Sequence, residues 1–263
     1  MIFMRTGSMK LNLKYPIVLV HGLGAKRGFG PIDYFYLLGS LLEEWGNTVY
    51  QADLSIWNGS DVRAEQLKSQ ILEHFPDSKV NLIGHSMGGI DARYMAAHLN
   101  VTDRIASITT IGTPNFGCAM VDYIMEAIPE AGMQITDKII SLFGLSHNGF
   151  KQLSSKFFNQ GIDRQPIPDV PALSYYSIAG AIPEPIQLHS LPVFWKTHKI
   201  LREIDGGDND GFVSVKSASH GELIGVYPFD HYRQIGHLLT KKQKVQYLSM
   251  ARDMVSLLAS RGH

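Results

Sequence analysis

The sequence contains little cysteine, no net charge and no long hydrophobic run. Its 263 residues include a single cysteine, Cys118, which excludes an internal disulfide bond and a zinc site built from cysteines. The 24 Lys and Arg residues balance 24 Asp and Glu residues, so the chain lacks the excess of positive charge with which proteins bind nucleic-acid phosphates. No segment reaches the roughly 20 apolar residues of a membrane-spanning helix. These absences argue against a nucleic-acid partner and a transmembrane segment, and they leave the oligomeric state open.

The N-terminal segment also lacks the apolar core of a secretion signal, because Pro16 to Val20 is too short to provide one. The junction Gly7-Ser8-Met9 is typical of a cloning remnant, so we expect residues 1–8 to be an added extension. If residue 1 or residue 9 is the natural start, we expect a cytoplasmic protein; a leader removed before Met9 is the alternative.

Strand-like and helix-like patterns alternate along the chain. Short apolar, β-branched runs predict strands at residues 16–20, 48–52, 80–83, 105–111, 173–179 and 212–215. Leu-rich or aromatic segments predict helices at residues 34–45, 62–75, 88–99 and 238–258. This order predicts an α/β fold, with one domain over residues 9–263 and a mostly parallel sheet covered by helices on both faces. The helix-rich residues 119–160 break the alternation and are predicted to form a lid, with ordinary packing helices as the alternative.

The stretch Gly84-His85-Ser86-Met87-Gly88 stands between a predicted strand and a predicted helix. Glycines at both ends allow the sharp turn of a nucleophile elbow, which exposes the serine hydroxyl at the N-terminus of the helix. This context predicts that Ser86 is the nucleophile of a serine hydrolase; a plain turn is the alternative.

A nucleophilic serine needs a base, and in α/β-hydrolases the acid and then the histidine follow the serine along the chain. Four histidines occur late in this sequence: His220, His231, His237 and the terminal His263. Since His231 lies in the polar stretch just before the last predicted helix, it is the predicted base, with His237 as the second choice.

The acid is expected beside a late strand. Asp205, Asp208 and Asp210 cluster in a glycine-rich stretch, and Asp210 comes just before the apolar run that begins at Phe212. We therefore predict that Asp210 orients the imidazole, with Asp208 as the alternative. An EF-hand calcium loop is excluded, because Ser217 stands where such a loop requires a bidentate Glu.

Acyl transfer also requires hydrogen-bond donors for the tetrahedral oxyanion. The backbone N–H of Met87, directly after the nucleophile, and that of Leu23, after the first strand, are the predicted donors. Apolar side chains of the insertion could line an acyl channel or the inner face of a lid, or simply pack the cap. They are Met120, Ile124, Met125, Ile128, Met133, Ile139, Ile140 and Leu142.

Several spaced motifs together resemble one family. Residues 14–23, 62–67, 80–89 and 209–213 are similar to the bacterial triacylglycerol lipases of the Pseudomonas/Burkholderia type, which are α/β-hydrolases that cleave esters of acylglycerols. The resemblance covers most of the chain except the lid region and the loops between Ala181 and Glu203. It implies Ser86, Asp210 and His231 as the catalytic triad, Leu23 and Met87 at the oxyanion hole, and secretion. It also implies that Arg63 braces loops near the site.

One position departs from this family. Its members brace the histidine loop with a calcium ion, and one carboxylate ligand stands two positions after the catalytic histidine. Here that position is Arg233, and no acidic residue follows between Gln234 and Leu239. Because a guanidinium repels a cation, we expect no calcium and no other cofactor, with Arg233 bridging to a carboxylate or carbonyl instead.

The sequence therefore predicts a lipase or esterase that acts on a lipid or another hydrophobic ester and contacts a lipid interface. Alternatives on the same fold are a short-chain esterase, a phospholipase or acyltransferase, and a polyester hydrolase. A non-catalytic hydrolase-fold binding protein is a remote alternative, since such proteins usually lose a triad residue.

Overall fold

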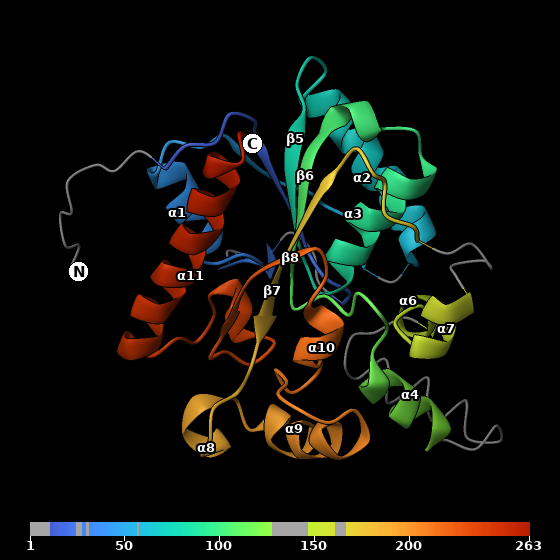
Figure 1. The fold of residues 1–263 in the computed structure, drawn as a ribbon, viewed down its shortest axis with the longest axis vertical. Coiled ribbons are helices and arrows are strands. Elements are labelled where there is room, and N and C mark those ends of the chain that lie inside the picture. The colour runs from blue at the N-terminus through green and yellow to red at the C-terminus, as the bar shows by residue number, and fades with distance from the viewer. Residues whose placement is uncertain (1–10, 25–27, 30–31, 57, 128–146, 161–166) are drawn as a thin grey trace.

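The computed structural model describes residues 11–24, 28–29, 32–56, 58–127, 147–160 and 167–263 (Figure 1). Its centre is a sheet of six parallel strands in the order β4-β1-β5-β6-β7-β8. The strands are β1 (Ile17–Val20), β4 (Val49–Gln51), β5 (Val80–His85), β6 (Ile105–Ile111), β7 (Ser174–Gly180) and β8 (Glu222–Tyr227). A short antiparallel pair, β2 (Gly28–Phe29) and β3 (Ile32–Asp33), lies outside this sheet. The predicted α/β fold is confirmed.

The alternation of side chains along β1 explains the two layers of helices. Ile17 and Leu19 enter one hydrophobic cluster, Val18 and Val20 enter the other, and all four are fully buried. Because successive strand residues point to opposite faces, a continuous apolar run marks a strand covered on both sides. Figure 1 shows these covers on opposite faces of the sheet: α1 (Leu38–Glu44) with α11 (Lys241–Ser260), and α2 (Ser60–His74) with α3 (Met87–His98).

The remaining helices gather at the carboxyl end of the sheet, toward which the arrow of β7 points in Figure 1. They are α4 (Ala119–Glu126), α6 (His147–Lys151), α7 (Ser155–Gln160), α8 (Ile186–His189), α9 (Val193–Ile204) and α10 (Val215–Ala218). Two single-turn 3₁₀ helices, Thr102–Arg104 and Arg233–Ile235, also lie within the described residues. In α/β sheets the carboxyl ends of the strands are where ligands bind, so this end is where the site is expected.

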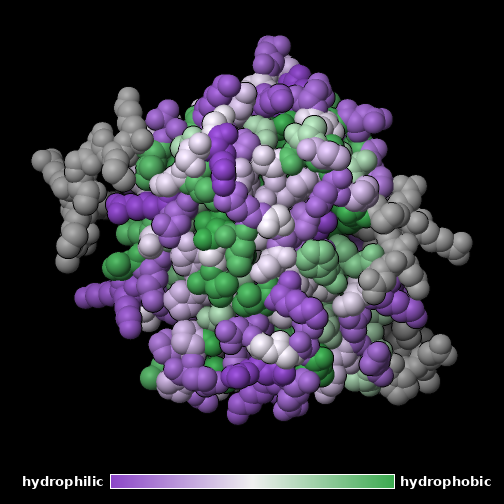
Figure 2. All heavy atoms as spheres, viewed as in Figure 1, coloured by the Kyte–Doolittle hydropathy of each residue, from purple (hydrophilic) through white to green (hydrophobic). Residues whose placement is uncertain are grey.

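The outer surface alternates hydrophilic and hydrophobic groups, as Figure 2 shows for one side. The exposed apolar side chains include Leu223 and Val226 of β8, which are 42% and 45% exposed. Among the described residues, no helix has the length and apolar content needed to cross a bilayer.

The predicted strand at residues 212–215 is wrong, and the last strand is β8 (Glu222–Tyr227). Residues before α10 instead form a tight turn, closed by a single bridge between Asn209 and Ser214. The Asp210 carboxylate accepts the N–H groups of Phe212 and Val213, which a strand would offer to its neighbour. β8 was not predicted, because it is a half-exposed edge strand without a continuous apolar run.

Two helices begin later than predicted, by three or four residues. The predicted helix at 34–45 begins only at Leu38, and residues 34–37 form a turn. The last helix begins at Lys241 rather than at residue 238, because Thr240 caps it by accepting the N–H of Gln243.

Candidate active site

Ser86 lies in the sharp turn between β5 and α3, with φ 54° and ψ −128°. A non-glycine residue with positive φ is strained and persists only where its surroundings enforce it. Here the surroundings are backbone: a Cβ at Gly84 would strike the backbone of Gly88, and a Cβ at Gly88 would strike the Val20 carbonyl. The two glycines therefore let β5, α3 and β1 meet closely enough to hold Ser86 in this conformation.

His231 lies between Ser86 and Asp210. Its Nε2 is 3.0 Å from Ser86 Oγ, and its Nδ1 is 2.8 Å from Asp210 Oδ2. Since an ionised carboxylate only accepts, the Nδ1–H donates to Asp210, and Nε2 is free to accept the serine proton. A backbone bond from the His231 N–H to the Asp210 carbonyl, 2.9 Å long, ties the two loops together. The three residues predicted as a triad thus meet, although they are far apart in the sequence.

Asp210 is 1% exposed and accepts four hydrogen bonds. Oδ1 accepts the N–H groups of Phe212 and Val213, at 2.9 and 2.6 Å. Oδ2 accepts His231 Nδ1–H and also Gln234 Nε2–H, the latter at 2.7 Å. These four bonds fix the orientation of the carboxylate beside the His231 imidazole.

The predicted oxyanion donors lie on either side of the elbow. Met87 is the first residue of α3, so its N–H has no acceptor within the helix. Leu23 lies in the loop after β1 and packs against the same hydrophobic cluster as Met87. The loop is anchored by Arg63, whose side chain is fully buried and whose Nη2 donates to the His21 carbonyl at 2.6 Å. The Arg63 Nε donates to Asp91 at 2.8 Å, which links α2 to α3 beneath the site.

His21 begins this loop and is held in one tautomer. Its Nε2 accepts the N–H of Leu54 at 3.0 Å, so its Nδ1–H donates to the Gly22 carbonyl. Burial, followed by the charge of Arg63, lowers the pKa of His21 to about 4. The imidazole therefore stays neutral and serves as a fixed support for the loop.

The alternative acid and bases lie elsewhere. His220 pairs with Asp169, at 2.9 Å, and His237 donates from Nε2 to the Tyr34 carbonyl at 2.9 Å. Asp208 is exposed, and no contact between it and His231 is found among the described residues. His263 Nε2 forms a hydrogen bond of 2.9 Å with the Tyr176 hydroxyl. None of these residues contacts Ser86.

The candidate acyl-channel residues divide into three groups. Met120 is 2% exposed and packs with Met87 in one hydrophobic cluster, against which Ile124 is partly buried. Met125 is 40% exposed and lies outside that cluster. Residues Ile128, Met133, Ile139, Ile140 and Leu142 lie outside the described residues, as does much of the predicted lid. Cys118 belongs to the same cluster, where burial raises the pKa of its thiol to about 12.

The residues at the position of the family's calcium site do not fit a divalent cation. The Arg233 guanidinium lies among oxygen acceptors: its Nη1 donates to the His189 carbonyl at 2.6 Å and to Asp230 Oδ2 at 3.2 Å. Its Nε donates to the Leu238 carbonyl at 3.4 Å. Within the described part of the chain, no group of three or more acidic, His or Cys residues is placed to hold a metal ion.

Three polar residues of the site were missed by the sequence analysis: Tyr34, His85 and Gln234. His85 stands inside the elbow motif and Gln234 three positions after His231, so their closeness to predicted site residues in the sequence could have identified them. No sequence feature marks Tyr34 as a site residue, because its partner His85 is 51 positions away.

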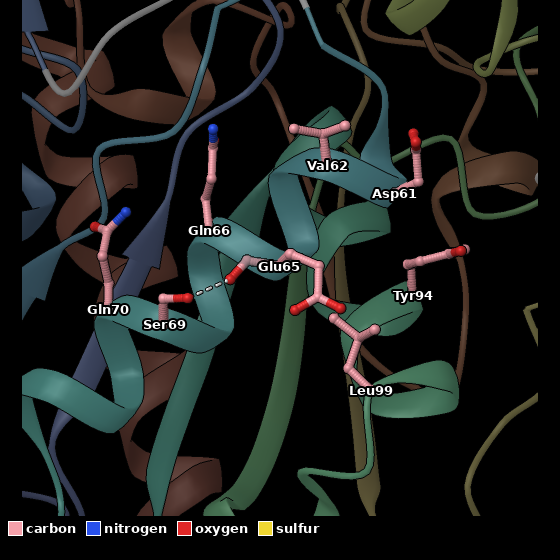
Figure 3. A pocket seen from close by; sticks show the side chains of 8 residues that line it. All are labelled: Asp61, Val62, Glu65, Gln66, Ser69, Gln70, Tyr94 and Leu99. Atoms are coloured by element: carbon pink, nitrogen blue, oxygen red, sulfur yellow. Dashed lines mark hydrogen bonds between the residues drawn. The ribbon is translucent and has the colours of Figure 1, made fainter.

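A separate surface groove lies between α2 and α3 (Figure 3) and contains none of the triad residues. It is lined by Asp61, Val62, Glu65, Gln66, Ser69, Gln70, Tyr94 and Leu99.

The fold and this constellation define an α/β-hydrolase, an enzyme class to which comparisons with known proteins also lead. A family model described as the alpha/beta hydrolase fold matches residues 15–137. A triacylglycerol lipase of Pseudomonas fragi is 30% identical over 266 residues, covering 87% of this chain and 90% of that lipase. One of Burkholderia plantarii is 38% identical over 137 residues, covering 49% of this chain and 38% of that lipase. The mature Bacillus licheniformis lipase BlEst2 superposes with a TM-score of 0.68 at 21% identity, covering 90% of this chain and 92% of that chain.

The chain belongs to the triacylglycerol lipase family of α/β-hydrolases, and it is a carboxylic ester hydrolase. The family resemblance and the enzyme class predicted from the sequence are confirmed. The roles of the individual site residues stay predictions.

Proposed function

We propose that this enzyme hydrolyses esters of lipids, acylglycerols among them, through an acyl-enzyme formed at Ser86. The observation that carries the proposal is the chain of contacts from Ser86 Oγ through His231 to Asp210, at 3.0 and 2.8 Å. Family membership supports the lipid substrate, because the relative that aligns over 90% of its own length is a triacylglycerol lipase.

In the proposed mechanism His231 Nε2 takes the proton of Ser86 as Oγ attacks the acyl carbon. The N–H groups of Leu23 and Met87 bind the oxyanion that forms, and α3 adds the favourable field of its N-terminus. His231 then gives its proton to the departing alcohol, which leaves an ester between the acyl group and Ser86. Water, deprotonated by His231, releases the acid and restores the serine. Throughout, Asp210 holds the imidazole and stabilises its charged form.

The acyl chain is proposed to lie along the cluster that contains Met120 and Ile124. Both pack near Met87, so a chain there would begin beside the oxyanion donors. Leu188 and Leu238 are 72% and 65% exposed and flank the carbonyls that Arg233 binds next to the histidine loop. We propose that they contact the lipid interface.

We further propose that the enzyme needs no calcium. The support is the placement of Arg233, whose guanidinium bonds two backbone carbonyls and one buried carboxylate where a cation would have to sit. A fixed positive charge on the chain then joins the histidine loop to the end of α8.

The test is hydrolysis of nitrophenyl esters from acetyl to palmitoyl, measured above and below substrate solubility. We expect the rate to persist or rise with chain length and to increase in emulsion. A rate that collapses beyond the shortest chains would contradict a lipase and favour the short-chain esterase.

Ser86→Ala should lower kcat on the order of 10⁶-fold, since nucleophile and base act as a unit. It should also abolish labelling by a fluorophosphonate probe. Ser107→Ala is the matched control: this serine is fully buried in the neighbouring β6 and bonds only Asn81 among the described contacts. Ester hydrolysis by Ser86→Ala near the wild-type rate would show that the nucleophile is wrong.

A further inference from the structure

Tyr34 and His85 lie between the two loops that the proposed mechanism uses. The Tyr34 hydroxyl is 2.7 Å from His85 Nδ1, and His85 Nε2 is 3.0 Å from the backbone carbonyl of His231. The same hydroxyl packs against Gly22, one residue before Leu23, where a Cβ would lie only 2.8 Å from the Tyr34 oxygen. Two hydrogen bonds therefore join Tyr34, which packs against the oxyanion loop, to the histidine loop.

Each hydrogen in this chain has one possible position. A carbonyl oxygen only accepts, so His85 Nε2 carries a hydrogen and donates it to the carbonyl of His231. His85 Nδ1 is then an acceptor, and the Tyr34 O–H donates to it. Because both links run in one direction, the chain is polarised from Tyr34 toward His231 and fixes one tautomer of His85.

Burial keeps both side chains neutral. Tyr34 is 7% and His85 2% exposed. Burial raises the pKa of Tyr34 above its usual value, so its hydrogen stays available. Burial and the nearby His231 hold the pKa of His85 well below its usual value, so His85 does not gain the second hydrogen that would oppose Tyr34.

The packing around the chain leaves it little freedom. A Cβ at Gly22 would come within 2.8 Å of the Tyr34 oxygen and 3.0 Å of Ser86 Cβ. The rings of His85 and His231 lie 4.7 Å apart. A second tie joins the same segments, since His237 Nε2–H donates to the Tyr34 carbonyl at 2.9 Å. Tyr34 is thus bound to the histidine loop through both its side chain and its backbone.

We propose that Tyr34 and His85 are positioning residues that hold the oxyanion loop and the catalytic histidine loop in register around Ser86. The inference rests on the proposed function, because it assumes that Leu23 and His231 act in catalysis. Neither side chain need touch the substrate. Their effect is to keep an N–H donor and a base, which come from loops about 200 positions apart in the sequence, aligned on one serine.

Tyr34→Phe tests the proposal with a minimal change, because the ring can keep its packing against Phe35. We expect kcat for a soluble ester to fall about 10-fold, the effect of losing one buried hydrogen bond, while KM changes less than about twofold. Affinity for an alkylboronic acid, which forms a tetrahedral adduct on the serine, should fall by a similar factor. Rates are to be expressed per site titrated with a fluorophosphonate.

Tyr247→Phe is the matched control. Tyr247 is fully buried against Phe229, and its hydroxyl has no hydrogen-bond partner among the described residues. It should keep the wild-type kcat. If Tyr34→Phe also shows the wild-type kcat per titrated site, the proposal is overturned. This holds even if a smaller fraction of the enzyme can be titrated, because Tyr34 would then contribute only to folding.

A second comparison tests whether Tyr34 acts through His85. His85→Leu should be impaired, and adding Tyr34→Phe should change its kcat less than about twofold. Independent effects that multiply would overturn the coupling. If His85→Leu does not fold, the comparison of kcat between Tyr34→Phe and Tyr247→Phe still tests the proposal. These outcomes are separate from the proposed function, which fails if Ser86→Ala retains activity.

Discussion

At the scale of a single residue, Asp210 is a buried carboxylate held in position by four hydrogen-bond donors. Two of its four donors come from its own turn, one from His231 and one from the amide of Gln234. Gln234 is fully buried, and its Oε1 has no partner among the described residues. An unpaired buried oxygen costs about 1–3 kcal/mol, so an amide retained there indicates that its Nε2–H bond matters to the site.

Gln234→Met removes this donor while keeping the shape of the side chain. Asp210 then loses one of the four donors that fix its carboxylate beside His231. We expect kcat to fall about 10-fold, the effect of losing one buried hydrogen bond.

Gln243→Met is the control, since this glutamine is 5% exposed and caps α11 without contacting the triad. It should lower stability and keep the wild-type kcat. A wild-type kcat in Gln234→Met would contradict the assigned role.

What the sequence could predict follows from the range of the interactions involved. Ser86 is marked by glycines within two positions of it, because the elbow is a local backbone requirement. His231 and Asp210 could be chosen by their order along the chain, and they meet Ser86 in the structure. The contacts of Tyr34 with His85, and of His85 with His231, join residues 51 and 146 positions apart. No local pattern encodes such contacts, so they emerge only from the fold.

At the scale of elements, the same reasoning explains the misplaced strand. The run beginning at Phe212 has the apolar, β-branched composition of a strand, yet its N–H groups bond the side chain of Asp210 instead of a neighbouring strand. A side-chain acceptor that competes with the neighbouring strand for backbone N–H groups cannot be recognised from the number of apolar residues in a segment. The true last strand, β8, is partly exposed, and its pattern carries weaker hydrophobic periodicity.

Arg233 joins three elements: the 3₁₀ turn that follows His231, the end of α8, and the segment before α11. Its partner Asp230 is fully buried, and burial raises the pKa of that carboxyl despite the guanidinium beside it. Removing one member of such a pair leaves an uncompensated charge. We expect Arg233→Met to lower the free energy of unfolding by about 3 kcal/mol and to reduce kcat.

A chelator should leave wild-type activity unchanged, and added calcium should not rescue Arg233→Met. Arg261→Met is the control, because its ion pair with Glu222 is exposed to solvent and should contribute little to stability. Activity lost to a chelator and restored by calcium would contradict the proposal that Arg233 replaces the ion.

At the scale of the whole molecule, buried histidines tie stability to pH. Burial lowers the pKa of His21 to about 4 and that of His85 well below its usual value. In the unfolded chain both take up protons near pH 6.5. As pH falls below that value the unfolded state therefore binds more protons than the folded state, and stability decreases.

We expect the free energy of unfolding to be constant above about pH 7 and to fall between about pH 6.5 and 5, by about 1.4 kcal/mol per pH unit for each such histidine. Urea unfolding across this range measures the slope. His21→Gln, whose amide can still accept the Leu54 N–H, should reduce the slope by about one proton. A flat dependence across this window would show that neither histidine is held neutral by the fold.

The single cysteine has a practical consequence. Cys118 is 1% exposed, its thiol donates to the Phe212 carbonyl, and burial raises its pKa to about 12. Since the thiolate is the reactive form, the native enzyme is nearly inert to maleimides. A cysteine placed at an exposed position such as Leu188 would then carry a dye or spin label alone, without any prior removal of a native thiol. The proposed contact of this enzyme with a lipid surface can therefore be tested by fluorescence on an otherwise unmodified chain.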